Sequence, residues 1–164
     1  MKKIVLAAFA AAIAAPAVAA PGDTDSATGT ATATIVAPIS IDHVAGASLA
    51  FGTITAGNGG TVTVALDGSV TDNADDAVVL TGSTTSADAF TLTGDPSRAI
   101  TVTVGGGNLT GPGADMAFTT TNNAPAALSA TGTGSFSVGG TLTVGDTQTP
   151  GSYSGTYTAT ATYN

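Results

Sequence analysis

The alternation over residues 152–163 constrains the fold of this chain more than any other feature. Tyr153, Tyr157 and Tyr163 fall on one parity, together with glycine and alanine, and threonine or serine fills the other parity. Successive residues of a strand face opposite sides of a sheet, so this pattern predicts a strand with one apolar and one hydroxyl face. A helix would place both kinds of residue on every side, so the pattern disfavours a helix here.

The same alternation recurs along most of the sequence, and glycine, proline, asparagine or aspartate separates one alternating segment from the next. No segment shows a helical period. Short alternating segments with such turns are typical of an antiparallel sandwich or barrel, so we predict one all-β domain. The predicted strands are residues 31–41, 49–54, 60–66, 78–81, 89–93, 100–104, 116–121, 127–130, 135–138, 141–144 and 152–163.

The first residues have the form of a secretory signal peptide. Lys2 and Lys3 precede an apolar run, and Ala17-Val-Ala19 fits a small-residue cleavage site. We predict a signal over residues 1–19, with Ala20 as the alternative last residue. No later segment has the roughly 20 apolar residues of a spanning helix. The expected location is therefore the periplasm in transit and then the cell surface, a fimbrium or the medium, with no membrane span.

Charge and cysteine content restrict the partners and the sources of stability. All eleven acidic residues are aspartates beyond residue 22, and Arg98 is the single basic residue after the predicted signal, which leaves a side-chain charge of −10. Binding to nucleic acid depends on lysine and arginine, so we expect no nucleic-acid partner. The chain has no cysteine, so packing and ladder hydrogen bonds must stabilise it.

The segment that follows the signal alternates for longer than one small sandwich needs. Residues 20–34 are predicted to be an N-terminal extension or donor-like strand, and residues 35–164 the sandwich domain. Typical strands have 5–6 residues, so the extension either protrudes or bends near Pro38 and wraps around the domain. One face of the extension carries Ala27, Gly29, Ala31, Ala33 and Ile35.

Residues that could carry catalysis or bind a metal are few. His43 is the single histidine, and no Gly-x-Ser-x-Gly motif accompanies it, so we predict a surface or turn histidine and no enzyme. Asp72, Asp75 and Asp76 form the best calcium candidate, because hard cations prefer oxygen ligands. They lack the spacing of an EF-hand loop, and a solvated acidic loop is the favoured interpretation. No metal and no cofactor are predicted.

The C-terminal strand resembles that of pilins assembled by chaperone–usher pathways, in which a glycine fourteen residues from the end and a penultimate tyrosine recur. Gly151 and Tyr163 occupy those positions. The resemblance implies an immunoglobulin-like sandwich that lacks one strand and receives the N-terminal extension of a neighbour. It also implies homo-polymers or related pilin subunits as partners, and a periplasmic chaperone and usher. The implied interface residues are Ala27, Gly29, Ala31, Ala33, Ile35, Gly151, Tyr153, Tyr157 and Tyr163.

A second resemblance covers more of the chain. The segments Leu49-Ala-Phe-Gly-Thr-Ile54 and Val138-Gly-Gly-Thr-Leu-Thr-Val144 are similar to those of a proteobacterial secreted domain of unknown function, number 4402. So are Ala31-Thr-Ala-Thr-Ile-Val-Ala-Pro-Ile39 and Gly151-Ser-Tyr-Ser-Gly-Thr-Tyr157. That domain in turn resembles spore-coat-U-like fimbrial subunits in its C-terminal strand.

Two functions are expected from these features. The first is an exported structural subunit of a bacterial surface filament or fimbria-like assembly, joined by β-strand addition. The alternative is a self-contained secreted β-sandwich that binds a glycan or coats the cell surface. The position of the N-terminal segment, within its own sheet or outside it, distinguishes the two.

Overall fold

The computed structural model describes residues 22, 26–72 and 77–164. The predicted signal over residues 1–19 lies outside the described residues. Chain contacts divide the protein into two units, Met1–Thr34 and Ile35–Asn164. In the part of the chain that the structure describes, no helix has the length and apolar character needed to cross a membrane.

The unit Ile35–Asn164 is an all-β, antiparallel sandwich, as the alternation predicts. Threonine and valine dominate its strands, because branched side chains pack well on a pleated surface. The strands are β1 (Ser40–His43), β2 (Ile54–Thr55), β3 (Gly60–Val64), β4 (Val70–Asp72), β5 (Val78–Val79), β6 (Asp88–Thr93), β7 (Ile100–Val104), β8 (Gly107–Leu109), β9 (Met116–Asn122), β10 (Thr133–Val144) and β11 (Ala159–Tyr163).

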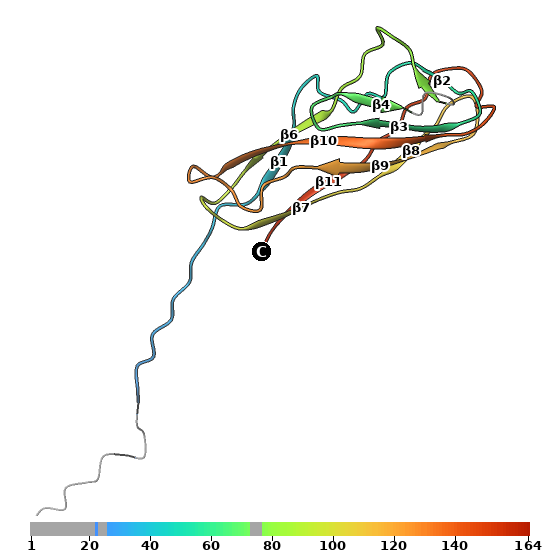
Figure 1. Ribbon diagram of the computed structural model, residues 1–164. Helices are drawn as coiled ribbons and strands as arrows, with labels where there is room; N and C mark the ends of the chain where they lie inside the picture. The colour runs from blue at the N-terminus through green and yellow to red at the C-terminus, as the bar shows by residue number, and fades with distance from the viewer. Residues whose placement is uncertain (1–21, 23–25, 73–76) are drawn as a thin grey trace, which may run out of the picture. The chain divides into compact units, whose positions relative to one another are not determined.

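The long strand β10 organises the larger sheet (Figure 1). Val138 pairs with Asp88 of β6 and with Asn122 of β9, while Gly140 pairs with Val64 of β3 and again with β9. One edge of β10 therefore holds β6 and then β3, and the opposite edge holds β9. Strand β1 extends this sheet beyond β6, β4 extends it beyond β3, and β8 extends it beyond β9.

The second layer consists of β7 and β11, which pair antiparallel with Tyr163 opposite Ile100. The two layers are joined through the segment that follows β7. That segment pairs with β9 along β8, and Thr110 also forms a bridge with Ser154 ahead of β11. Hydrogen-bonded pairing thus runs from β1 through β6, β10, β9 and β8 to the C-terminal strand.

Two groups of buried side chains fill the space between the layers. One group contains Phe51, Val62, Val64, Ala77, Met116, Phe118, Leu142 and Val144. The other contains Leu92, Ile100, Leu128, Phe136 and Val138. Tyr157 packs against both groups from the C-terminal segment. The odd-numbered residues of that segment, which include its tyrosines, therefore face the core, as the alternation predicts.

The predicted strand over residues 152–163 is too long. Regular pairing begins only at Ala159, and Ser154 contributes a single bridge. The reason is a β-bulge in the opposite segment: four residues separate Thr110 from Gly105, whereas three separate their partners Ser154 and Thr158. The extra residue lies in the glycine run 105–107. There the chain leaves its pairing with β11 and begins its pairing with β9, so the ladder with the C-terminal segment is interrupted.

The predictions over residues 135–138 and 141–144 are also wrong at their boundary. Those two segments form one strand, β10, which crosses Gly139 and Gly140 without a turn. A Cβ at Gly140 would lie 2.6 Å from the Thr119 carbonyl oxygen, so the glycines serve close strand packing instead of a turn.

Further predicted strands differ from the observed ones. Residues 127–130 contribute only the bridge from Ala127 to Ala99, and residues 49–54 little beyond the bridge from Ala50 to Ser86. Strands β4 and β8 were not predicted, because each has only three residues and follows or contains glycine.

The predicted strand over residues 31–41 is wrong for most of its length, because pairing starts only at Ser40. Residues 26–34 have no strand and every one is exposed. Gly29 has no atom within 4 Å of an added Cβ. Ile35, the first residue of the sandwich unit, is 96% exposed. An alternating segment forms a strand only when a partner edge is present, and this segment has none among the described residues.

Candidate functional site

The C-terminal segment has one edge whose backbone groups face no strand. The Thr158 carbonyl oxygen accepts from Gly105 N–H, and the backbone N–H of Asn164 donates to Ala99. Because backbone groups of an antiparallel strand alternate between its two edges, the odd residues direct theirs to the other edge. No described residue pairs with that edge. Its residues are Tyr153, Gly155, Tyr157, Ala159, Ala161 and Tyr163.

This free edge faces the start of the domain across an unpaired seam. We use "seam" for the space between residues 153–163 and residues 39–56. Strand β1 forms one wall of the seam, and β11 forms the other wall, with no hydrogen-bonded ladder between them. An exposed strand edge is a template for pairing with a further strand.

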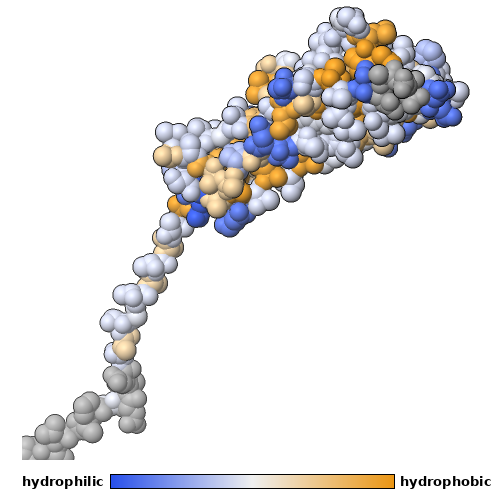
Figure 2. Space-filling model, viewed as in Figure 1, coloured by the Kyte–Doolittle hydropathy of each residue, from blue (hydrophilic) through white to orange (hydrophobic). Residues whose placement is uncertain are grey.

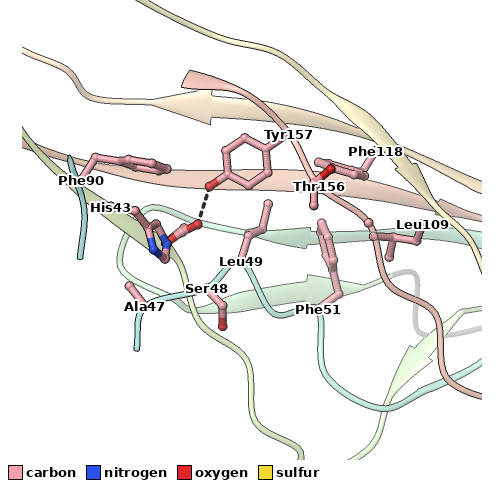
Figure 3. A pocket seen from close by; sticks show the side chains of 12 residues that line it. His43, Ala47, Ser48, Leu49, Phe51, Phe90, Leu109, Phe118, Thr156 and Tyr157 are labelled. Carbon is pink, nitrogen blue, oxygen red and sulfur yellow. Dashed lines mark hydrogen bonds and ion pairs between the residues drawn. The ribbon is translucent and has the colours of Figure 1, made fainter. Parts of the chain in front are cut away.

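A cavity of about 370 Å³ opens into the seam beside His43, the last residue of β1 (Figure 3). Leu49, Phe51, Leu109 and Phe118 provide apolar walls, and His43, Asp88 and Tyr157 form its polar end. Figure 3 shows His43 towards one end of the opening and Leu109 towards the other, with Leu49 between them. The cavity is therefore mostly apolar, with one convergent polar cluster.

A larger cavity of about 1030 Å³ continues the opening towards the far end of the domain. The two cavities share Leu49, Phe51, Leu109 and Gly155, so they form one groove. Its walls are residues 49–56 on one side and residues 148–155 on the other. Met116 and Leu142, which belong to the core, line its floor. In Figure 2, apolar residues in orange surface among paler residues of intermediate hydropathy on the face in view.

The polar cluster is centred on Asp88, which is only 5% exposed. One carboxylate oxygen lies 2.7 Å from Nε2 of His43 and accepts from the backbone N–H of Ala89. The other accepts from the Tyr157 hydroxyl at 2.6 Å. Burial, the hydrogen bond to Asp88 and its negative charge raise the pKa of Tyr157. The carboxylate is thus fully bonded and ties β1, β6 and the C-terminal segment together.

Tyr163 makes a second connection, from the C-terminal strand to the residues that precede β1. Its hydroxyl donates to the Ala37 carbonyl oxygen at 2.9 Å and accepts from the backbone N–H of Asp95 at 2.7 Å. The Arg98 guanidinium lies over its ring, 5.5 Å from the centroid. A Cβ at Gly94 would collide with the hydroxyl, so the glycine makes room for this tyrosine. Tyr163 therefore holds the backbone at Ala37, near the start of the domain, against the C-terminal strand.

The chain matches a family described as "Domain of unknown function (DUF4402)" over residues 39–163. It belongs to this family. No curated protein and no solved structure matches the chain. In this DUF4402 protein the matched range includes both walls of the seam, the groove and the Asp88 cluster.

The predicted interface residues of the DUF4402 protein fall into two groups. Tyr153, Tyr157 and Tyr163 lie on the free edge with partly buried side chains, and Gly151 precedes them next to Pro112. The other predicted interface residues, Ala27, Gly29, Ala31, Ala33 and Ile35, are exposed and lie in or beside the unpaired N-terminal segment.

Asp72 is the one predicted metal candidate that lies in the described residues. Asp72 accepts from the backbone N–H of Val79 at 2.6 Å, and Asp75 and Asp76 lie outside the described residues. Across residues 26–72 and 77–164, no three metal-ligating side chains gather into a group.

His43 is an exposed residue at the end of β1, so its predicted surface position is confirmed and a turn is not found, and its partner was not predicted. The sequence does contain a signal for this cluster, because Asp88 has the same parity as Phe90 and Leu92, which face inward in β6. An acidic residue at an inward position indicates a bonded, buried carboxylate. Ser48 also lines the cavity, but Figure 3 shows its hydroxyl directed away from His43.

Proposed function

We propose that this protein is an exported structural subunit of a surface filament or fimbria-like assembly, joined to its neighbours by β-strand addition. The observation that carries the proposal is the free edge of residues 153–163 beside an apolar groove. Backbone groups along such an edge supply affinity, and pockets for alternate side chains supply specificity.

The same chain offers a segment suited to that edge. Residues 26–36 contain no charged side chain and alternate small residues with hydroxyl residues. Residues 26–34 are exposed throughout and have no strand partner in the described chain. A segment with strand alternation and no partner gains a full set of ladder hydrogen bonds when it joins the open edge of a second copy.

The decisive experiment places charge on one face of this segment. In the chain starting at Ala20, the double variant Ala31→Asp/Ala33→Asp should reduce association at least tenfold, because carboxylates would enter an apolar groove. Thr30→Asp/Thr32→Asp carries the same charge on the opposite face and should assemble normally. Light scattering after gel filtration measures both.

Either of two results would contradict the proposal. A wild-type chain that stays monomeric at high concentration shows that copies do not join. Equal assembly of the two double variants shows that the segment does not enter a groove with one face inward. Both pairs of substitutions lie at exposed positions outside any strand, so loss of folding does not confuse the comparison.

A second candidate is a self-contained domain that binds a glycan. The wide end of the groove favours it, because Thr53, Thr84, Gln148, Thr149 and Ser152 line the larger cavity and could bond sugar hydroxyls. Binding of the monomer on a glycan array, weakened by Gln148→Ala, would support this function. Gln148 lies outside the free edge of residues 153–163, so under strand addition Gln148→Ala should leave association between copies unchanged, which separates the two candidates.

A further inference from the structure

The two ends of the seam differ in width. Cα atoms of β1 and β11 approach within 8 Å of each other. A strand lying between two others needs walls about 9.6 Å apart, which is twice the spacing of about 4.8 Å between paired strands. The end of the seam between β1 and β11 is therefore too narrow for a further strand.

Side-chain bonds hold this narrow end closed. The Tyr163 hydroxyl joins the C-terminal strand to Ala37, and Asp88 joins His43 of β1 to Tyr157. Ile39 and Ile41 also pack with Ala159 and Ala161 around the same core group. A strand entering here would have to break both sets of hydrogen bonds and expose apolar side chains.

The other end of the seam is open. Opposite Tyr153 and Gly155 lie residues 49–56, which form only the bridge at Ala50 and the short strand β2. Both cavities open here, and their walls come from those residues and residues 148–157. The backbone groups of this part of the edge face the groove and not another strand of the described chain.

We infer that an incoming strand pairs only with residues 153–157, and that the Asp88 cluster marks the inner limit of its insertion. The inference rests on the proposed function and states which part of the edge is used. Its occupant is the segment 26–36 of a second copy.

Charge and side-chain size favour this occupant. The groove lining contains one described acid, Asp88, which is bonded to His43 and Tyr157, and the segment itself is uncharged. Ile35 is 96% exposed and has the largest apolar side chain of the segment. The walls formed by Leu49 and Phe51 offer it an apolar site. A second copy thus supplies an exposed isoleucine to a cavity that its own domain leaves open.

Disulfide trapping tests the position, since the chain has no cysteine of its own. One set of copies carries a cysteine at Thr30, Thr32 or Thr34 in turn, and these positions share one face of the segment. The other copies carry Thr156→Cys beside the open end or Thr162→Cys beside the closed end. Both threonines are exposed and lie on the same parity of the C-terminal segment, so they are matched controls.

Mixed copies should form the cross-linked dimer with Thr156→Cys at least tenfold more than with Thr162→Cys, because a disulfide needs Cα atoms within about 7 Å. Trapping at residue 162 would overturn the inference but keep strand addition. Assembly without trapping at residue 156 would also overturn it. Absence of any association between copies would instead reject the proposed function.

Discussion

Asp88 is the buried acid of the described residues, and its bonds to three donors determine what the cluster contributes. A buried carboxylate without partners is costly, so each donor matters more here than it would at the surface. The sequence showed its inward parity, but the partners lie 45 and 69 positions away along the chain. Local patterns do not identify partners at such separations.

Removing the Tyr157 hydroxyl should destabilise the domain. Tyr157→Phe keeps the ring but leaves one Asp88 oxygen without its donor. We expect a loss of about 1.5–3 kcal/mol in the free energy of unfolding, as for hydrogen bonds to charged groups. Tyr153→Phe is the control, because its hydroxyl donates to the Thr149 carbonyl oxygen at an exposed site. Urea denaturation of both variants measures the difference, and equal stabilities would show that the Asp88 bond contributes nothing.

The raised pKa of Tyr157 predicts a loss of stability in alkaline solution. The folded protein holds this proton more tightly than the unfolded chain. The resulting stabilisation is complete below the ordinary tyrosine pKa of about 10 and is lost as the pH rises above it. The unfolding temperature should therefore fall more steeply between about pH 8.5 and 11.5 for the wild type than for Tyr157→Phe. Parallel declines would mean that another group titrates.

Among the elements, the strands show what alternation can and cannot predict. The all-β class and the inward tyrosines follow directly from parity, which the sequence displays. Strand ends do not, because they depend on the opposite chain: β11 begins late owing to a bulge around Gly105, and β10 continues through Gly139 and Gly140. A glycine that packs closely cannot be told from a glycine that turns by sequence alone.

A methyl group at Gly140 should disturb the sheet. Its Cβ would lie 2.6 Å from the Thr119 carbonyl oxygen and 3.1 Å from a methyl carbon of Leu49, so neighbouring strands must move. Gly140→Ala should reduce the free energy of unfolding by about 1–3 kcal/mol, as overpacking does in other cores. In Gly105→Ala the nearest atom is 3.8 Å away, so that variant should be nearly neutral. Denaturant titration compares them, and a neutral Gly140→Ala would show that the sheet adapts freely.

At the scale of the whole molecule, the seam could not be predicted from the sequence. The seam exists because β1 stands at one end of the series of paired strands, next to β6, while β11 stands at the other end, next to β7. Those pairings join residues far apart in the chain, and parity says nothing about which edges remain free. The uncharged N-terminal segment, in contrast, was visible in the sequence as an alternation longer than the domain requires.

Copies of this chain repel one another, because each carries a large net negative charge. Residues 20–164 carry one arginine against eleven aspartates, while the segment 26–36 is uncharged. Salt shortens the Debye length from about 30 Å at 0.01 M to about 10 Å at 0.1 M, which screens repulsion between domains without weakening an apolar, backbone-bonded contact. Association should therefore become faster with added sodium chloride, by a factor on the order of 10.

Reducing the charge should have the same effect as adding salt. Asp115 and Asp146 are exposed, so Asp115→Asn/Asp146→Asn removes two charges without touching a buried group. The variant should associate faster than the wild type at low salt and should depend less on salt, as measured by time-resolved light scattering. Association that slows as salt is added would mean that attraction between opposite charges joins the copies. Strand addition through the uncharged segment and groove would then not be the main contact.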